Sequence, residues 1–192
     1  SKKIIINIAG RPLDNIKKLV SEMETIFEGN KIILQVGFQN YPTAVNDLLL
    51  NKVNELSREF PKNIISYADH VDGSSPLALK IPIYAILSGA SYIEKHICID
   101  PMKTKYDFQS AITPATAEEL LKSIKECESA IGTRFISSNE TKYLNSTIEK
   151  PIAGTDLRIG DIINSNKLSF RRTNQKGLKI DEIKTIMTGR YC

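Results

Sequence analysis

The chain has 192 residues, of which 41% are hydrophobic and 25% charged, with a formal net charge of +4. This composition is typical of a soluble globular protein, and no apolar run is long enough to span a membrane. Basic and acidic residues are mixed along the chain, so a nucleic-acid partner is not expected. The three cysteines have no metal-ligand spacing, and the opening residues lack the pattern of a secretion signal. We therefore expect reduced thiols and a cytoplasmic location.

Short apolar runs alternate with helical patterns from the start of the chain to Gly132. Four β-rich runs begin about thirty residues apart, at Ile4–Ala9, Ile32–Val36, Ile64–Tyr67 and Tyr92–Glu94. After each run, apolar residues recur at spacings of three and four, which predicts a helix. Such βα units form parallel sheets through right-handed crossovers, so the pattern predicts an α/β fold.

The size of this region indicates half of a larger fold. A (βα)8 TIM barrel takes about 250 residues, so four units in residues 1–132 correspond to its second half. Half a barrel has two unpaired strand edges, and we expect four further units to come from elsewhere. A complete, open, flavodoxin-like sheet of four strands is the alternative.

The remainder of the chain differs in kind. Residues 133–150 are polar and are predicted to be a linker. Residues 151–192 contain short strand-like pieces separated by glycines, which predicts a small, mostly β domain. About forty residues make a small independent core, so this domain is expected to dock on the barrel or on another subunit.

His70 and His96 are the only histidines, and each follows a predicted strand. Neighbouring parallel strands lie about 4.8 Å apart, so imidazoles at their carboxyl ends can reach one divalent ion. Neutral imidazole suits Mn, Fe, Co, Ni or Zn. The alternative is that each histidine is hydrogen-bonded separately in its own loop, and no third ligand is obvious.

Other polar residues fall on the same edge of the predicted sheet. The loop at residues 37–43 offers amides, the Tyr41 phenol and a hydroxyl, which can bind a sugar or can form an ordinary proline turn. Asp107 lies in the loop after the fourth strand. It can belong to a functional site, or it can simply be a solvated loop carboxylate. Arg171 and Arg172 end a strand-like stretch in the small domain. Adjacent arginines are usually just exposed, but a guanidinium can also bind a carboxylate or a phosphate.

The motifs NYPTAVNDLLLNKV, IISYADH, GASYIEKHICID and YDFQSAITP, in this order, resemble the N-acetylneuraminate (sialic acid) synthases and their legionaminate and spore-coat relatives. The resemblance covers most of residues 1–132 and implies the second half of a TIM barrel. The later stretch TIEKPIAGTDLRIGDIINSNKLSFRR resembles the start of that family's antifreeze-like (SAF) domain, here incomplete.

The resemblance implies roles for particular residues. His70 and His96 match the two histidines that bind a catalytic divalent metal, usually manganese, with magnesium or cobalt as alternatives. Tyr41 and Asp107 match the contacts to the N-acylated sugar, and Arg172 matches an arginine that reaches it from the partner subunit. Contacts to phosphoenolpyruvate are implied for two further positions, Gln39 and Asn7. The family commonly has asparagine or serine at the first and serine at the second.

The activity implied by the resemblance is a transferase reaction of carbohydrate biosynthesis. Phosphoenolpyruvate condenses with an N-acyl sugar aldehyde such as N-acetylmannosamine, giving a nonulosonic acid and phosphate. The implied assembly is a homodimer with swapped antifreeze-like domains. The family's phosphate-binding lysines and a metal-side glutamate lie in the first half of its barrel, so we expect the 192 residues alone to be inactive. The alternatives are a non-catalytic carbohydrate-binding or assembly subunit and another metal-dependent barrel aldolase.

Overall fold

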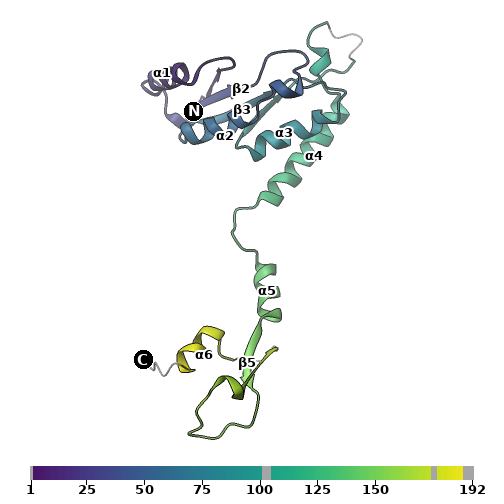
Figure 1. Cartoon of the computed structure of the whole chain (residues 1–192). Helices are drawn as coiled ribbons and strands as arrows, with labels where there is room; N and C mark the ends of the chain where they lie inside the picture. The colour runs from purple at the N-terminus through teal and green to yellow at the C-terminus, as the bar shows by residue number, and fades with distance from the viewer. Residues whose placement is uncertain (1, 101–104, 174–176, 188–192) are drawn as a thin grey trace. The chain divides into compact units, whose positions relative to one another are not determined.

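A computed structural model describes residues 2–100, 105–173 and 177–187 of the chain. The chain divides into two compact units, Ser1–Gly132 and Thr133–Cys192. Each unit is described by itself below, because the positions of the parts relative to one another are not determined (Figure 1).

The first unit is built on a four-stranded parallel sheet. Its strands are β1 (Ile4–Asn7), β2 (Ile32–Val36), β3 (Ile64–Asp69) and β4 (Tyr92–Lys95), in the order β1-β2-β3-β4. This confirms the predicted α/β fold with a parallel sheet. A flavodoxin-like sheet reverses its strand order at a switch point, and the described sheet has no such reversal. The strand order is therefore not that of a flavodoxin-like sheet, whereas an open sheet of four strands is what both the half barrel and a complete small sheet would show.

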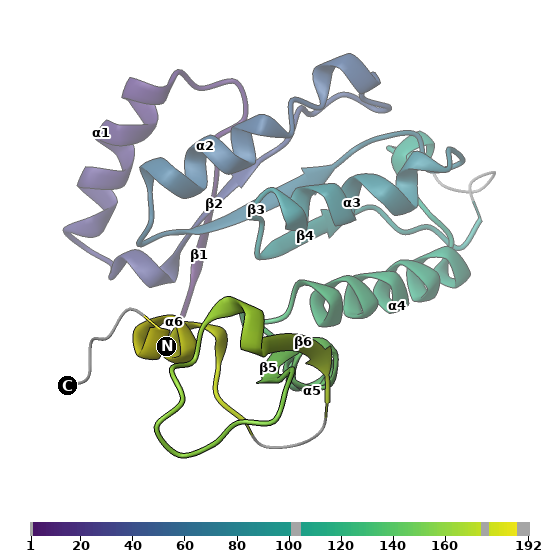
Figure 2. The ribbon, with the colours of Figure 1, turned by 60° about the horizontal axis from the view of Figure 1, so that its bottom comes forward.

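Three helices connect consecutive strands of the sheet, and a fourth follows the last strand. They are α1 (Leu13–Glu24), α2 (Asn51–Glu59), α3 (Leu77–Leu87) and α4 (Pro114–Ile131). Because every crossover moves one strand further in the same direction, right-handed connections place the helices on one face of the sheet. Figure 2 shows α2 and α3 running along the strands, with α4 beside α3. Short 3-10 turns lie at Gly29–Lys31, Val45–Asp47 and Phe108–Ser110 in this unit, and another lies at Ser165–Lys167 in the second unit.

The hydrophobic core lies between the sheet and these helices. Core residues alternate along the strands, as in Ile32, Leu34 and Val36. They recur at helical spacing in the helices, as in Val53 and Leu56. The two outer strands are less covered, because Ile5 of β1 is 58% exposed and Tyr92 of β4 is 42% exposed. The sheet thus has two central strands that are buried and two edge strands that are open on one side.

The second unit has less regular structure. It contains α5 (Ser138–Thr147), the antiparallel pair β5 (Glu149–Ala153) and β6 (Leu168–Arg172), and α6 (Ile180–Met187). The segment expected to be a linker therefore includes a helix. Its start is a capping box in which the Glu140 N–H donates to the Ser137 hydroxyl at 3.0 Å and the Ser137 N–H donates to the Glu140 carboxylate at 2.6 Å.

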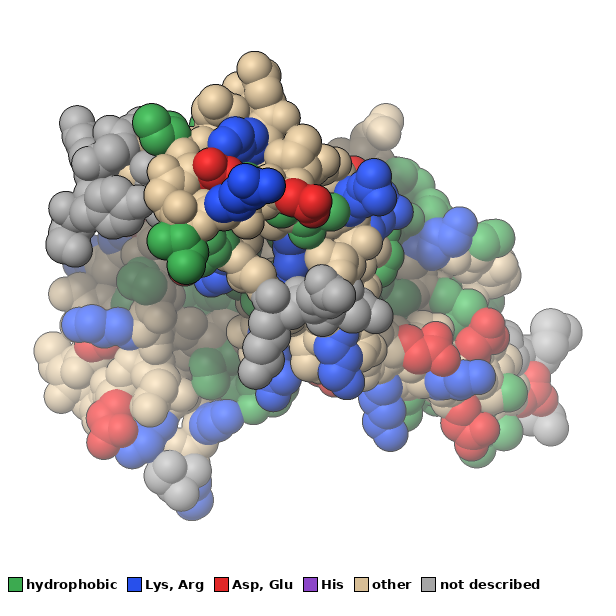
Figure 3. Space-filling model, turned by 90° about the horizontal axis from the view of Figure 1, so that it is seen from below, with side chains coloured by type: hydrophobic (Ala, Val, Ile, Leu, Met, Phe, Trp, Pro, Cys, Tyr) green, Lys and Arg blue, Asp and Glu red, His purple; other side chains and the backbone are tan. Residues whose placement is uncertain are grey.

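The surface carries both signs of charge. On the face shown in Figure 3, Lys and Arg side chains are interspersed with Asp and Glu and with patches of apolar atoms. Within the described ranges, no helix combines the length and apolar character needed to cross a membrane. Cys98 and Cys127 are free thiols, and Cys192 lies outside the described residues.

Gly73 gives a test of how closely two loops of the first unit approach each other. A Cβ at this position would lie 1.9 Å from the Ala111 carbonyl oxygen, so Gly73→Ala must push the segment after β4 away. We expect a loss of at least about 2 kcal/mol in the free energy of unfolding, measured by urea denaturation. Gly10→Ala is the control. Gly10 has φ +72° with open space around it, so only the conformational cost of about 1 kcal/mol applies. Equal losses would contradict the close approach.

Candidate metal centre and substrate site

The two histidines converge at the carboxyl ends of neighbouring strands. Asp69 of β3 pairs in register with Lys95 of β4, so the next residues, His70 and His96, extend the two strand ends side by side. Their ring centroids are 5.3 Å apart. His70 is buried, whereas His96 is partly exposed. The structure thus brings together the two side chains singled out by their positions in the sequence.

Glu94, which the sequence motifs did not single out, joins the two histidines as a third candidate ligand. Within the described part of the chain, one ligand atom from each of His70, Glu94 and His96 lies within 4.8 Å of the others. Glu94 and His96 are two residues apart on a strand, so their side chains point to the same face. That spacing was visible in the motif EKH. Two imidazole nitrogens and a carboxylate oxygen form a donor set that suits Mn²⁺, Fe²⁺, Co²⁺ or Zn²⁺.

A hydrogen bond selects the ring nitrogen of His70 that is free to bind a metal. His70 Nδ1 lies 2.9 Å from the Phe38 carbonyl oxygen, which can only accept a hydrogen bond. Nδ1 therefore carries the proton in the neutral ring, and Nε2 keeps its lone pair. Metal-binding histidines usually donate their second ring nitrogen to a carbonyl or carboxylate in this way.

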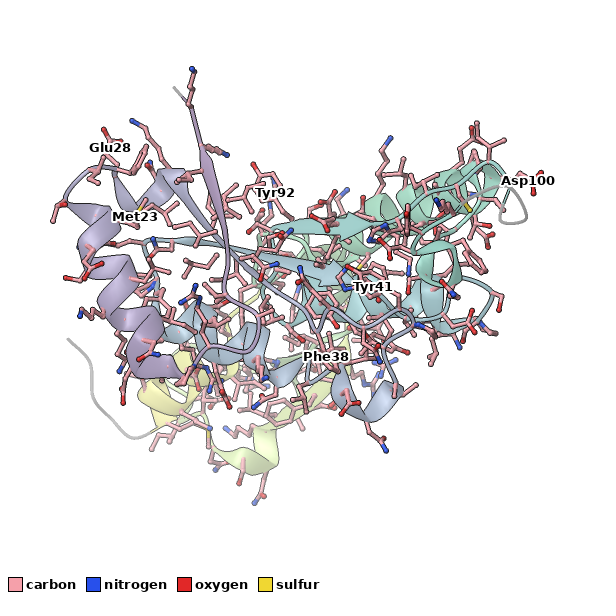
Figure 4. All side chains as sticks on the ribbon, turned by 90° about the horizontal axis from the view of Figure 1, so that it is seen from above. Met23, Glu28, Phe38, Tyr41, Tyr92 and Asp100 are labelled. Atoms are coloured by element: carbon pink, nitrogen blue, oxygen red, sulfur yellow. The ribbon has the colours of Figure 1, made fainter. Side chains whose placement is uncertain are left out.

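The loop after β2 is tied to the end of β3. The Thr43 N–H donates to the His70 carbonyl at 2.8 Å, and the Thr43 hydroxyl lies 2.9 Å from the carbonyl oxygens of both Phe38 and Asn40. Tyr41 and Pro42 are joined by a cis peptide bond. Figure 4 labels Phe38 and Tyr41, which both belong to this loop, and Tyr92, which begins β4. The loop is thus a bonded structure that presents Tyr41 at the strand ends.

Tyr41 lies against both histidines. Its ring centroid is 4.7 Å from that of His70 and 5.4 Å from that of His96, in edge-on geometry. Burial raises the pKa of the Tyr41 phenol, and the negative charges of Asp107 and Glu94 raise it further. The phenol therefore stays protonated at neutral pH and can donate a hydrogen bond to an oxygen held beside the histidines.

The segment after β4 returns to the same strand ends. The Ser110 hydroxyl donates to the His70 carbonyl at 2.7 Å, and the Ile112 N–H donates to the His96 carbonyl at 2.9 Å. Asp107 adopts a left-handed conformation with φ 57° at the start of this segment, and its carbonyl accepts the Ser110 N–H at 3.1 Å. Asp107 is thereby held near the Tyr41 phenol, whose pKa it influences.

The other three residues implied by the resemblance differ in their placement. Asn7 ends β1, and its side-chain oxygen accepts the Ala9 N–H at 2.9 Å. Gln39 is exposed in the loop after β2. Arg172 ends β6 in the second unit, so its position relative to the histidines is not determined. Within the first unit, the structure therefore assembles His70, His96, Tyr41 and Asp107.

Asp69 and Lys95, which directly precede the two histidines, form a buried ion pair on the helix side of the sheet. Lys95 Nζ is 2.9 Å from Asp69 Oδ2, and their side chains are 5% and 0% exposed. Lys95 also donates to the Val71 carbonyl at 3.3 Å, and the Val71 N–H donates to Asp69 at 3.0 Å. Burial raises the pKa of the Asp69 carboxyl, and the Lys95 ammonium opposes that shift. Since side chains alternate along a strand, directing Asp69 and Lys95 to the helices directs His70 and His96 to the opposite face.

Comparison with known protein families identifies the first unit. A family model described as "NeuB family" matches residues 1–135. The chain belongs to the NeuB family. This confirms the resemblance to sialic acid synthases and their legionaminate and spore-coat relatives that the sequence motifs indicated.

Individual NeuB-family relatives match at low identity. The chain is 25% identical over 175 residues to the N,N'-diacetyllegionaminic acid synthase of Campylobacter jejuni, covering 90% of this chain and 51% of that one. It is 25% identical over 145 residues to the human N-acetylneuraminate-9-phosphate synthase, covering 74% of this chain and 39% of that one. The chain thus spans about half the length, or less, of the curated relatives it matches.

Solved structures share the fold. A spore coat polysaccharide biosynthesis protein E from Chromobacterium violaceum matches with a TM-score of 0.73 at 20% identity, covering 88% of this chain and 49% of that one. The sialic acid synthetase of Leptospira borgpetersenii matches with a TM-score of 0.63 at 23% identity, covering 75% of this chain and 50% of that one.

The buried ion pair predicts a large difference between two lysine substitutions. Lys95→Met leaves the Asp69 carboxylate buried without its partner, which should cost about 3–5 kcal/mol in the free energy of unfolding. Lys17→Met is the matched control, because Lys17 pairs with Glu59 at 2.7 Å but the two side chains are 46% and 40% exposed. We expect no measurable loss there. Urea denaturation measures both, and similar values for the two variants would contradict the assigned burial of the Asp69–Lys95 pair.

Proposed function

We propose that the protein condenses phosphoenolpyruvate with an N-acyl sugar aldehyde of the N-acetylmannosamine type, giving a nonulosonic acid and phosphate. The observation that carries the proposal is the cluster of His70, Glu94 and His96 beside the Tyr41 phenol. Membership of the NeuB family supports the reaction class, and the relatives named above are synthases of acidic sugars of this kind.

His70, Glu94 and His96 would hold a divalent metal, with manganese preferred and magnesium or cobalt as alternatives. The protonated Nδ1 of His70 is fixed by the Phe38 carbonyl, so Nε2 is free to bind the metal. The bound ion would act as a Lewis acid that polarises the aldehyde oxygen of the sugar.

The neighbouring side chains would bind and orient the substrates. Tyr41 would donate a hydrogen bond to a sugar oxygen, because its phenol remains protonated at neutral pH. Asp107 would accept hydrogen bonds from sugar hydroxyls, and Arg172 of a partner subunit would reach the same sugar. Asn7, which ends β1, and Gln39, in the loop after β2, would contact phosphoenolpyruvate.

The reaction balances without a redox partner. The C3 methylene carbon of phosphoenolpyruvate forms a bond to the aldehyde carbon, whose oxygen takes up a proton. Water adds at C2, where positive charge develops, and the C2–O bond to phosphate then breaks. The products are a 2-keto acid and inorganic phosphate. Negative charge would develop on the aldehyde oxygen. Hydrogen-bond donors already fixed beside that oxygen would lower the activation barrier most, because they need no reorganisation.

We further propose that the parallel sheet is the second half of a (βα)8 barrel. The sequential strand order and the open outer strands support this, as does the match to about half of each similar structure. In this proposal the second unit is part of an antifreeze-like domain that is swapped in a cytoplasmic homodimer. The antiparallel pair β5–β6 is the feature that supports a small β-containing domain.

Metal binding tests the proposed function. His70→Ala should weaken Mn²⁺ binding by more than about a hundredfold, since loss of an outer partner alone costs about 10–100-fold. Isothermal titration of the 192-residue chain with Mn²⁺ measures the change. Glu126→Gln, an exposed carboxylate on α4, is the control and should leave the affinity unchanged. Equal Mn²⁺ affinity of the His70→Ala variant and the unsubstituted chain would contradict the assignment of His70 as a metal ligand.

We propose that the 192-residue polypeptide alone does not catalyse the condensation, because it spans about half the length of its relatives. Incubation with phosphoenolpyruvate, N-acetylmannosamine and Mn²⁺ should release no phosphate above a protein-free blank. A full-length synthase of the family, assayed with its own sugar, establishes that the assay detects product. Steady phosphate release by the purified 192-residue chain would refute this expectation.

A further inference from the structure

Gln35 contacts the candidate metal centre from two strands away. Its side-chain nitrogen donates to Glu94 Oε2 at 2.8 Å, although Gln35 lies on β2 and Glu94 on β4. Gln35 is only 7% exposed whereas Glu94 is exposed, so the bond is partly buried. None of the roles implied by the family motifs involves this residue.

The sheet is built so that this contact can form. Gln35 pairs in register with Ser66 of β3, and Glu94 pairs with Ala68 of the same strand. Two strand spacings separate β2 from β4, roughly 10 Å in total, which only long side chains can bridge. Ser66 and Ala68 are both small, so they leave room above β3 for the Gln35 and Glu94 side chains to meet.

The bond has two consequences for Glu94. It holds one carboxylate oxygen of a long and otherwise exposed side chain, which leaves the other oxygen for a cation. The amide is also neutral, so it orients the carboxylate without cancelling the negative charge that attracts the metal. A lysine in the same place would orient Glu94 but would compete with the cation.

We propose that Gln35 is a positioning residue, which fixes the orientation of Glu94 and thereby raises the affinity of the His70–Glu94–His96 cluster for a divalent metal. This inference rests on the proposed function of that cluster. Gln35 does not touch the metal or the substrate in this proposal and acts only through the Glu94 carboxylate.

The test replaces the amide with an apolar side chain of similar length. Gln35→Met should weaken Mn²⁺ binding by about 10–100-fold, the range for partners that orient a ligand. Gln109→Met makes the same replacement at an exposed position and should leave the affinity unchanged. Circular dichroism shows whether each variant is folded. Gln35→Leu provides a second removal of the amide if the methionine variant does not fold.

A double-mutant cycle separates positioning from general damage to the sheet. In the Glu94→Ala background, Gln35→Met should cause no further loss of Mn²⁺ affinity, because the group it orients is already gone. An equal loss in both backgrounds would show that Gln35 only supports the fold, and the inference would be overturned.

The measurements distinguish this inference from the proposed function. If the unsubstituted chain binds Mn²⁺, His70→Ala abolishes binding and Gln35→Met has no effect, then the positioning role is wrong and the metal centre stands. If the unsubstituted chain binds no Mn²⁺, the metal centre is wrong and the role of Gln35 is overturned with it.

Discussion

The candidate site depends on the registered ends of two neighbouring parallel strands, which the Asp69–Lys95 pair holds together. This ion pair is buried on the helix side of the sheet, where its two charges and the Val71 backbone satisfy one another. Because side chains alternate along a strand, the residues that follow must point to the opposite face. His70 and His96 therefore meet there, and a shift of one residue in either strand would separate them.

The backbone of His70 is the second point on which the site depends. Its carbonyl oxygen accepts both the Thr43 N–H and the Ser110 hydroxyl, which belong to the loops after β2 and β4. One residue directly after a central strand thus anchors the two loops that carry Tyr41 and Asp107. This arrangement is available only because the carboxyl ends of parallel strands share one edge, which is where the ligands of open and closed α/β folds bind.

Sequence reasoning predicted that His70 and His96 meet and that Tyr41 lies on the same edge of the sheet, but it did not anticipate the contacts of Glu94 and Gln35 there. The histidines were visible because they are the only two in the chain and both follow apolar runs. Glu94 lay in the same motif, yet a glutamate is so often a solvated surface residue that its spacing alone did not single it out. Gln35 could not be found from spacing, because its bond to Glu94 crosses a whole strand. The helix α5 was missed because polar composition outweighed the capping box at its start.

The alternation of strands and helices, the family and the residues at each strand end can all be read from the amino-acid sequence alone. These are local properties, set by apolar periodicity and by motifs read along the chain. Which strand-end side chains meet cannot be read from the sequence, because that depends on strand order, register and the small size of Ser66 and Ala68. A hydrogen bond between residues 59 positions apart, such as Gln35 to Glu94, exists only once three strands lie side by side.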